Sequence, residues 1–462
     1  MGSSAGRGEA FANDAKEVYE SDRDATTGAQ RMNAPPKTTE VVVIGGGVAG
    51  VATAYYLAMA DVPVVLCEKG VIAGEQSSRN WGWIRKQGRD PRELPAIILA
   101  LRLWENIARE LKENIGWIKG GIAYVAETDA ELAGFERWLP HAREHQLDTR
   151  LLSPVETDAL LRQGAKRFKG AMFTPSDGRA DPGRAVPALA RAAEERGASI
   201  HENCAVRSLE TQGGKVAGVV TEHGPIACRA VVLAAGAWTA LFLRHLGFEL
   251  PQLKVKASVQ RTEMAPLITE SAVGTTRAAF CRRQDGGYTI ARSGAVTFDL
   301  TPAALRHFQA YLPALKEKWP DLKLRLGRAF IDELTTSSSW KADRPTPFER
   351  TRVLDPAPDH KALDQIMRDA ADLFPQLQGV RPVERWAGMI DVTPDEIPVL
   401  GPVDGMAGLL VATGFSGHGF GIGPAAGYLM AQLAIGEQPT VDLHPFRFTR
   451  FREHAIARYP EP

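Results

Sequence analysis

Apolar and polar positions predict a first βαβ unit from residue 41 onward. Residues 41–44 (VVVI) are a continuous β-branched run, the pattern of a parallel strand buried on both faces. Residues 51–60 (VATAYYLAMA) predict a helix that Asp61, Val62 and Pro63 end. A second apolar strand then follows and ends at Glu68. Strand, helix and strand in this order indicate part of a parallel sheet.

Later segments continue the mixture of helices and strands. Residues 93–114 have apolar positions at three- and four-residue spacing with charges opposite, which predicts an amphipathic helix. Residues 120–127 predict a strand, and Asp181-Pro182 opens another helix that leads into a strand. Two strands joined at residues 212–215 come next, then buried strands at 230–233 and 408–414, and a last helix that ends at Ile435.

The pattern changes between about residues 253 and 383. Alternating strands at 255–263 and 286–293 accompany a long helical stretch at 301–319. We therefore predict an α/β protein with a Rossmann-like domain interleaved with an α+β domain on a mostly antiparallel sheet. The first would comprise residues 39–115, 180–250 and 384–462. The second would comprise residues 116–179 and 251–383, with a helical insertion near 300–350.

Length and composition narrow the class of protein. A chain of 462 residues is too long for one ordinary core, which agrees with two domains. Hydrophobic residues make up 44% and charged residues 24%, as in soluble globular proteins. The 55 basic and 55 acidic residues balance, so charge gives no reason to expect nucleic acid or an anionic membrane surface as a partner. The sequence leaves homo-oligomerisation open.

Cysteines and the N-terminal segment suggest a cytoplasmic protein. Cys67, Cys204, Cys228 and Cys281 lie far apart without C-x-x-C spacing, so we expect buried free thiols and neither disulfides nor a metal site. Residues 1–38 are polar, lack an apolar core for a secretory signal and are expected to be a disordered tail. No stretch has the roughly 18 apolar residues of a membrane span.

The turn after the first strand has the spacing of a dinucleotide-binding fingerprint. Gly45 permits a tight turn, Gly47 lets backbone approach a pyrophosphate, and Gly50 lets helix and strand pack closely. Glu68, eighteen residues after Gly50, can accept hydrogen bonds from a ribose. A glycine-rich turn without a ligand would not require an acidic residue at this distance.

Two distant segments favour FAD over a nicotinamide cofactor. The strand at 230–233 ends in Ala234, Ala235 and Gly236, where a bulky ligand could lie against bare backbone. Residues 414–427 would direct a helix N-terminus at the negative charge that a reduced flavin develops at N1 and O2. The glycines of this second segment also have a structural explanation, because small residues let a helix pack tightly against its neighbours.

Five stretches together resemble the FAD-dependent amino-acid oxidase family. They are "IGGGVAG…EK", "GEQSSR", "VVLAAGAW", "RWAGMIDVTPDEIPVLGP" and "GFSGHGFGIGPAAG". That family includes D-amino-acid, glycine and sarcosine oxidases and bacterial amino-acid deaminases, and the resemblance extends from about residue 39 to the C-terminus. "EKGVIAGEQSSR", "NCAVRSLETQGGK", "VVTEHG", "TPFE" and "VERW" look most similar to the L-amino-acid deaminases of Proteus-type bacteria.

The resemblance implies a set of residues around noncovalent FAD. The ADP half would contact Gly45, Gly47, Val48, Ala49, Gly50, Glu68 and Lys69, with Val206 meeting adenine through its backbone. The pyrophosphate and the approach to the flavin would be lined by Gln76, Ser77, Ser78, Arg79, Gly82 and Trp83. Ala235, Gly236 and Trp238 would pack near the junction of the ribityl chain with the ADP. The ring would be touched by Gly417, Gly419, Phe420 and Gly421, and Gly388, Gly414 and His418 are further expected cofactor contacts.

Three departures from the family pattern change what we expect. Membrane-bound deaminases carry an apolar N-terminal anchor, whereas this chain has a polar tail, which leaves transfer of electrons to a respiratory chain in doubt. Sarcosine oxidases attach flavin through a cysteine near the "TPD" motif, and the tract 387–389 has none, so FAD should be noncovalent. The lysine that those oxidases place after "GHGF" is replaced by Gly421.

An amino-acid substrate requires a cation for its carboxylate, and arginine binds both oxygens with its planar fork. Arg85 is the leading candidate, because the similar "IIR" of sarcosine oxidases binds carboxylate, and Arg282 is the second. Either could instead be a solvated arginine. His418 could face the substrate or have its ring bonded to backbone, and Trp386 and Trp83 could wall the pocket or belong to the core.

The reaction we expect is hydride transfer from Cα of an L-amino acid to flavin N5, followed by hydrolysis of the imino acid to a 2-oxo acid and ammonia. Dioxygen or an unidentified acceptor would reoxidise FAD. D-amino or N-methyl substrates, as in sarcosine oxidases, remain alternatives. A flavin monooxygenase or NAD(P)H-dependent reductase should carry a second glycine fingerprint, which the sequence lacks. A noncatalytic dinucleotide-binding module would bind a cofactor that amino acids do not reduce.

Overall fold

The computed structural model describes residues 34–162, 168–294, 296–318 and 322–452. The chain divides into two units, Met1–Pro36 and Lys37–Pro462, and the described helices and strands all belong to the second. Most of the expected disordered tail, residues 1–38, lies outside the described residues. Lys37 and Thr38 belong to the second unit, where Ala227 N donates to Lys37 O at 2.9 Å and Thr38 forms a β-bridge with Ala227.

The first sheet has six strands and contains the predicted βαβ unit. In spatial order they are β20 (Val399–Pro402), β21 (Leu409–Thr413), β12 (Ala230–Leu233), β1 (Val41–Ile44), β2 (Val64–Cys67) and β8 (Ser199–His201). All neighbours are parallel except β20 and β21. Val41, Val42 and Val43 are fully buried, as expected for a strand covered on both faces.

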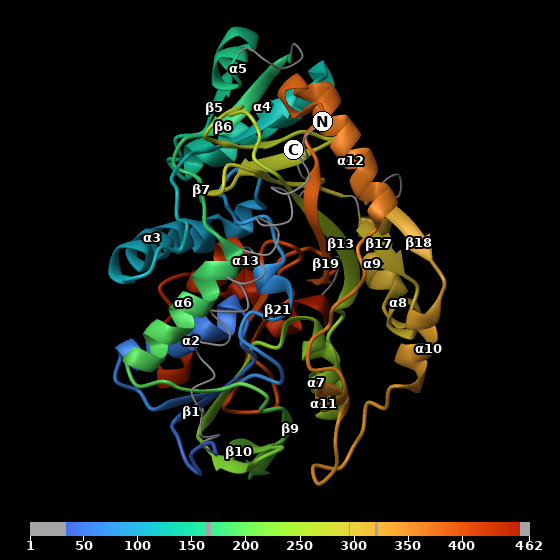
Figure 1. The fold of residues 1–462 in the computed structure, drawn as a ribbon. Helices are drawn as coiled ribbons and strands as arrows, with labels where there is room; N and C mark the ends of the chain where they lie inside the picture. Colours follow the sequence, from blue (N-terminus) through green and yellow to red (C-terminus); the bar gives the residue numbers. More distant parts are fainter. Residues whose placement is uncertain (1–33, 163–167, 295, 319–321, 453–462) are drawn as a thin grey trace, which may run out of the picture. The chain divides into compact units, whose positions relative to one another are not determined.

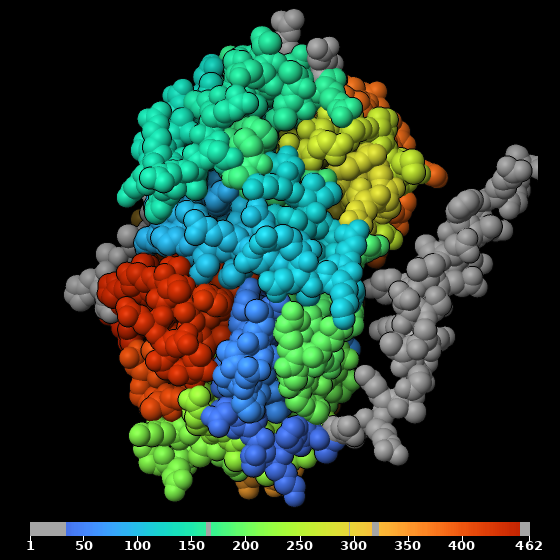
Figure 2. Space-filling model, turned by 90° about the vertical axis from the view of Figure 1, so that its left-hand side faces the viewer, coloured from blue at the N-terminus to red at the C-terminus, as the bar shows by residue number. Residues whose placement is uncertain are grey.

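Four helices pack against one another next to the six-stranded sheet. They are α2 (Val48–Met59), α3 (Leu94–Glu110), α6 (Pro182–Glu195) and α13 (Gly419–Ile435). Asp181 caps α6 by accepting from Gly183 N at 2.9 Å, which confirms the predicted start of that helix. Figure 2 shows α2 in blue between α6 in green and α13 in red, below the cyan segment of α3.

The glycines of α13 divide into two groups. The glycine-rich segment was expected to open the last helix, and Gly421, Gly423 and Gly427 lie inside that helix. A Cβ atom on Gly423 would come within 2.6 Å of Val48, and one on Gly427 within 2.5 Å of the Cβ of Ala52. These two glycines therefore allow α13 to approach α2, while Gly414 and Gly417 lie in the turn before the helix.

A second sheet has ten strands and is mostly antiparallel, as predicted. Its order is β18 (Leu322–Arg325), β17 (Val296–Asp299), β13 (Leu253–Thr262), β16 (Tyr288–Ala291), β15 (Ala279–Arg282), β14 (Ala272–Gly274), β4 (Ile122–Ala126), β6 (Gly170–Thr174) and β5 (Arg150–Leu152). The tenth strand, β19 (Pro382–Val392), pairs with β13 over its whole length. The expected domain boundary at residue 384 therefore falls within a strand of this sheet.

Smaller elements complete the framework. The hairpin predicted at residues 212–215 joins β9 (Val206–Gln212) to β10 (Lys215–Thr221), and β11 (Gly224–Ala227) completes a three-stranded sheet. A two-stranded ribbon pairs β3 (Trp83–Ile84) with β7 (Gly178–Arg179). The remaining α-helices described before residue 250 are α4 (Asp129–Glu144), α5 (Pro154–Leu160) and α7 (Thr239–His245).

The region near residues 300–350 is largely helical, as expected of an insertion. The stretch predicted as one helix consists of α8 (Pro302–Arg306) and α9 (Phe308–Lys318), separated at His307. It is followed by β18, α10 (Arg328–Thr335) and α11 (Pro347–Arg350), and the chain continues into α12 (His360–Leu373). Figure 1 shows α8, α9 and α10 together, whereas α11 lies beside α7.

Candidate active site

A pocket lies at the carboxyl ends of β1, β2 and β12, where open α/β sheets bind their ligands. The predicted cofactor residues that line it are Gly45, Gly47, Val48, Ala49, Glu68, Lys69, Gln76, Ser77, Val206, Ala235, Gly236, Trp238, Gly417, Gly419 and Phe420. The structure thus brings together segments separated by up to about 370 positions.

The glycine turn has the geometry that a dinucleotide fingerprint requires. Gly45 has φ of +110°, and a Cβ there would lie 2.5 Å from the carbonyl oxygen of Ala234. A Cβ on Gly50 would lie 2.0 Å from the carbonyl oxygen of Gly45. The turn leads directly into α2, whose N-terminus faces the pocket through Val48 and Ala49. This helix end suits a pyrophosphate.

Glu68 is positioned to bind a ribose. Its two carboxylate oxygens accept hydrogen bonds from Gly46 N and Gly70 N, both at 2.7 Å. Each oxygen retains a second acceptor position for a hydroxyl group. Burial raises the pKa of Glu68, and the two backbone hydrogen bonds act in the opposite direction.

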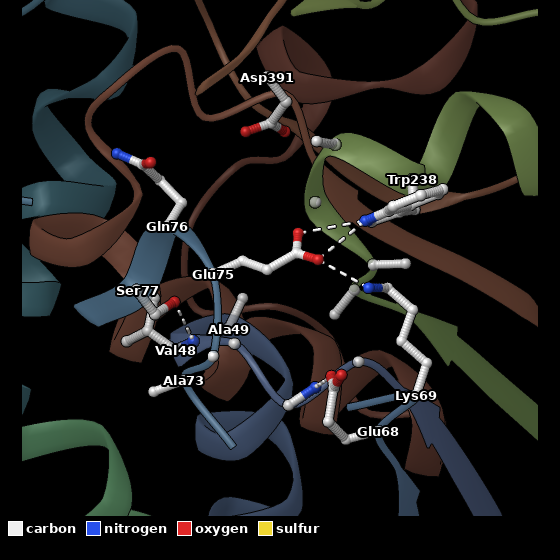
Figure 3. Close-up of a pocket in the computed structure, with 18 of the residues that line it drawn as sticks. Val48, Ala49, Glu68, Lys69, Ala73, Glu75, Gln76, Ser77, Trp238 and Asp391 are labelled. Atoms are coloured by element: carbon white, nitrogen blue, oxygen red, sulfur yellow. Dashed lines mark hydrogen bonds and ion pairs between the residues drawn. The ribbon is translucent and has the colours of Figure 1, made fainter. Parts of the chain in front are cut away.

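Glu75 links three segments across the pocket (Figure 3). Lys69 Nζ donates to Glu75 Oε1 at 2.7 Å, and Trp238 Nε1 donates to both carboxylate oxygens at 3.0 and 3.1 Å. Lys69 Nζ also lies 4.6 Å from the centroid of the Trp238 ring. The positive charge of Lys69 therefore offsets the negative charge of the Glu75 carboxylate. Near the α2 N-terminus an unpaired carboxylate would repel a pyrophosphate.

Asp391 lies at the opposite end of the pocket from Glu68 (Figure 3). Its Oδ2 accepts from Gly414 N at 2.6 Å, Gln252 Nε2 at 3.0 Å and Thr413 Oγ1 at 3.2 Å. Burial raises the pKa of this carboxyl, while its hydrogen bonds lower it. The side chain thereby fixes the turn that precedes α13.

The first turn of α13 faces the same end of the pocket. His418 is its N-cap residue, and Gly419 and Phe420 line the pocket immediately after it. Backbone N–H groups at a helix N-terminus stabilise negative charge. The turn can therefore stabilise the electron-rich edge that a flavin acquires on reduction.

Two further observations fit FAD. Gln76 Oε1 is buried and has no hydrogen-bond partner among the described residues, although Gln76 lines the pocket. Gly236 has φ of +49°, and a Cβ there would meet no described atom within 4 Å, so its backbone is open to a ligand. A buried unsatisfied acceptor is costly unless a ligand or water satisfies it. The N3–H of a flavin is one donor of the kind that Gln76 needs.

Several predicted cofactor residues do not line the pocket. These are Gly50, Ser78, Arg79, Gly82, Trp83, Gly388, Gly414, His418 and Gly421. Gly388 lies against Gln76, since its Cβ would come within 2.0 Å of Gln76 Oε1. Ser78 Oγ donates to Glu75 O at 3.3 Å. Gly82 has φ of +80°, and a Cβ there would lie 2.3 Å from Ala180 O.

Arg79 connects loops and does not face the ligand space. Its guanidinium donates to the carbonyl oxygens of Gly74 at 3.0 Å, Ala387 at 3.0 Å and Leu354 at 3.1 Å, and pairs with Asp355 at 2.7 Å. Arg79 therefore supports the pocket from outside and joins it to β19 and to the chain after α11.

Arg85 follows β3, which crosses the first turn of α13. A Cβ on Gly421 would lie 3.3 Å from Trp83 O and 3.5 Å from Ile84 Cα. The Arg85 guanidinium lies 5.4 Å from the centroid of the Tyr124 ring, and Trp83 packs edge-on against Tyr124 at 6.1 Å. Arg85 and Trp83 thus lie close to the end of the pocket that α13 forms.

Trp386 and Arg282 differ in position. Trp386 Nε1 donates to Arg79 O at 3.0 Å, which places its indole against the loop that leads to Trp83. On β15, Cys281 Sγ contacts Trp81 O at 3.2 Å. Arg282 points to the other face of the sheet, where it donates to Ala265 O at 2.6 Å and lies over the Tyr288 ring at 5.0 Å. The structure does not bring Arg282 together with Arg85.

Sequence reasoning missed part of the pocket. The lining also includes Gly46, Cys67, Val71, Ala73, Glu75, Asn80, Phe242, Phe348, Arg352, Val353, Met389, Asp391 and Phe415. Glu75 lies within the stretch "GEQSSR" and Asn80 follows it, while Asp391 lies within "RWAGMIDVTPDEIPVLGP", so both stretches gave a signal. Phe348 lies in the stretch "TPFE", one of those that resemble the deaminases, whereas Arg352 and Val353, which follow it, gave no signal.

The four cysteines are buried and free, as predicted. None of the described helices has both the length and the apolar character needed to cross a membrane.

Comparison with known proteins identifies the family. The model of the FAD-dependent oxidoreductase family matches residues 40–433. Among solved structures, an L-amino acid deaminase from Proteus myxofaciens in complex with anthranilate superposes with a TM-score of 0.88. It is 31% identical over 91% of this chain and 95% of its own.

Curated relatives include a glycine oxidase from Pseudomonas aeruginosa, 28% identical over 88% of this chain and 97% of its own length. The human mitochondrial sarcosine dehydrogenase is 26% identical over 92% of this chain, which spans only 42% of that longer protein. The α/β fold and the pocket agree with these likenesses. The family supports oxidation of an amino acid or an N-methyl amino acid. This chain belongs to the FAD-dependent oxidoreductase family, and FAD is its cofactor.

Proposed function

We propose that this protein catalyses the FAD-dependent oxidative deamination of an L-amino acid to a 2-oxo acid and ammonia. The observation that carries the proposal is the likeness to the Proteus myxofaciens deaminase, which extends over nearly the whole of both chains. Anthranilate, the compound bound in that structure, has a carboxylate next to an amino group, the two functional groups that an amino acid carries.

Arg85 is the proposed anchor of the substrate carboxylate. It lies beside the Tyr124 ring and follows the strand that crosses the first turn of α13. A guanidinium there can bind both carboxylate oxygens and present Cα toward the end of the pocket formed by α13. Trp83 and Trp386 are proposed to exclude water from the same region. Arg282 is the alternative anchor, but its contacts lie on the other face of its sheet.

FAD, when bound, accepts the Cα hydrogen with its two electrons. The protein contributes position and electrostatics: the turn at Gly417 and Gly419 supplies backbone donors where negative charge develops, and Asp391 holds that turn. A neutral substrate amine needs no protein base. His418, as the N-cap residue of α13, is proposed to shape this turn. The imino acid leaves as product and water hydrolyses it. Dioxygen or another acceptor would then take up the two electrons.

Oxidation of an N-methyl amino acid is the second candidate, favoured by the likeness to the sarcosine dehydrogenase. The two reactions give different products. Deamination yields a 2-oxo acid and ammonia in equal amounts, whereas oxidation of sarcosine yields glycine and formaldehyde.

Product analysis separates these functions. Purified protein is incubated with L-phenylalanine, L-leucine, their D-enantiomers and sarcosine, in air and with an artificial electron acceptor. Ammonia, 2-oxo acids, formaldehyde and hydrogen peroxide are then measured. We expect ammonia and a 2-oxo acid in a 1:1 ratio from L-substrates. Formaldehyde from sarcosine without ammonia from any L-amino acid would reject the proposal. Peroxide in air would identify dioxygen as an acceptor.

A further inference from the structure

Residues 346–355, which we call the strap, run from α11 to the chain that precedes α12 and close one side of the FAD pocket. Phe348, Arg352 and Val353 of the strap line the pocket. Arg352 and Val353 lie against Lys69 and Gly70, the residues that directly follow Glu68, where the ribose is expected. The strap is thus placed at the adenosine half of the cofactor.

The first attachment of the strap leads to the backbone expected to meet adenine. Arg352 forms an ion pair with Glu222, with Nη2 2.6 Å from Oε2. Glu222 Oε1 in turn accepts from Ala205 N at 2.6 Å, and the next residue, Val206, lines the pocket. Burial would raise the pKa of Glu222, but the hydrogen bond from Arg352 lowers it below its usual value, so the carboxylate stays charged.

The second attachment joins the strap to the residues after β2. Arg352 Nη1 donates to Lys69 O at 2.8 Å, and Lys69 Nζ donates to Thr351 O at 3.0 Å and Arg352 O at 2.8 Å. The chains approach so closely that a Cβ on Gly70 would lie 2.3 Å from Arg352 O. Lys69 also pairs with Glu75, whose Oε1 accepts from Leu354 N at 3.0 Å.

The third attachment lies at the start of the strap and combines apolar packing of Phe348 with an ion pair of Glu349. Phe348 is 5% exposed and packs against the rings of Trp238 at 5.9 Å and Phe242 at 5.8 Å. Next to it, Glu349 caps α11 and pairs with Arg207 Nη2 at 2.5 Å. Figure 1 shows α11 lying against α7.

We propose that the strap is a part of the FAD site that retains the adenosine half of the cofactor, so that FAD binds and leaves only when the strap lifts. A loop with a single helical turn can lift without disrupting the six-stranded sheet. The Arg352–Glu222 pair keeps the strap closed and acts as a positioning contact. The proposal depends on the FAD site alone and holds for any substrate.

The direct test is the rate of FAD release from the holoenzyme. Release is followed by the rise in flavin fluorescence after dilution into cofactor-free buffer, for the wild type, Arg352→Gln and Glu222→Gln. Arg350→Gln is the matched control, because Arg350 is an exposed arginine of the strap, two residues before Arg352 at the end of α11. Each single variant loses the charged hydrogen bond between Arg352 and Glu222, so FAD release should be about tenfold faster or more. A variant that carries both substitutions should release FAD at the same rate as either single variant. The control should match the wild type.

The melting temperature of each apoprotein is measured alongside. A purely structural role would lower it and leave the release rate of the folded protein unchanged, which would overturn the proposal. Release at the wild-type rate from Arg352→Gln would do the same.

Hydrogen exchange on the unmutated protein gives an independent test if the variants fail to fold. FAD should slow amide exchange in residues 346–355 strongly relative to the apoprotein, with less change in the exposed helix α10. Equal exchange in the strap with and without FAD would overturn the proposal. Neither readout uses a substrate. A negative result for the strap therefore says nothing against the proposed deaminase reaction, and a negative result for that reaction says nothing against the proposed role of the strap.

Discussion

The carbonyl oxygen of Gly45 lies only 2.0 Å from the position that a Cβ atom on Gly50 would occupy. The absence of a Cβ at Gly50 thus lets the first turn of α2 lie close to the glycine turn that follows β1. Nothing larger than hydrogen fits at residue 50 without a backbone shift.

Gly50→Ala should therefore destabilise the apoprotein by about 1–3 kcal/mol, because overpacking outweighs the better helix propensity of alanine. The free energy of unfolding in urea measures this. Gly183→Ala is the control, since Gly183 also lies in the first turn of a helix and its Cβ would meet only Asp181 at an ordinary 3.4 Å. That change should be neutral or stabilise by up to about 1 kcal/mol. Equal effects at both sites would contradict the close contact.

Arg85→Lys should weaken binding of the substrate carboxylate. A lysine supplies the charge but not the planar pair of donors, so the KM for an L-amino acid should rise about tenfold to a hundredfold, with a smaller change in kcat. Steady-state rates measure both constants, and Arg282→Lys serves as the comparison. An unchanged KM in Arg85→Lys together with a raised KM in Arg282→Lys would transfer the anchor to Arg282.

Glu93 should make stability depend on pH. Glu93 is 2% exposed, and its carboxylate lies 3.6 Å from Arg89 Nη1. The charges of Arg89 and Arg85 lower its pKa, whereas those of Asp90 and Asp395 raise it. Burial raises its pKa from 4.5 to about 7. The folded chain therefore binds more protons than the unfolded chain between these values, and stability falls as the pH rises through that window.

Glu93→Gln should remove this dependence, because glutamine resembles the protonated acid. Relative to the wild type, the variant should gain about 3 kcal/mol of unfolding free energy between pH 4.5 and 7.5. Urea unfolding at several pH values measures the difference. Glu136→Gln, at an exposed position of α4, should show the same pH profile as the wild type. If the pH profile of Glu93→Gln ran parallel to that of the wild type, it would contradict the assignment of this pH dependence to Glu93.

FAD should be released completely when the protein is denatured with acid. The segment 387–389, where a covalent link would be expected, contains no cysteine. After precipitation with trichloroacetic acid, all flavin absorbance should remain in the supernatant. Yellow colour retained by the washed precipitate would show a covalent bond.

Much of the fold could be predicted because its elements are locally encoded. The strand at Val41–Ile44, the glycine turn and Glu68 are consecutive, and one βαβ unit contains them all. The start of α6 at Asp181-Pro182 follows from capping chemistry. The continuation of α13 through Gly421, Gly423 and Gly427 was harder to predict. Glycine disfavours an isolated helix by about 1 kcal/mol. The close packing of Gly423 on Val48 and of Gly427 on Ala52 reverses that preference.

The part of the site that the sequence did not reveal comes from long-range contacts. Phe348 and Arg352 reach the pocket because Arg352 pairs with Glu222 and Phe348 packs on Trp238. Neither partner is near in sequence, and no periodicity records such a pairing. Arg79 belongs to the "GEQSSR" stretch that predicted cofactor contacts. Its guanidinium nevertheless binds backbone carbonyl oxygens and does not line the pocket.

Anaerobic reduction of the bound flavin tests the central claim most directly. The purified protein should carry one FAD per chain, with Lys69, Glu75 and Trp238 on one side and the first turn of α13 on the other. Under argon, an L-amino acid such as L-phenylalanine should bleach the flavin band near 450 nm, a wavelength typical of oxidised flavins, and the D-enantiomer should leave it unchanged. A colourless protein that takes up no FAD, or a yellow one that no L-amino acid reduces, would contradict the account.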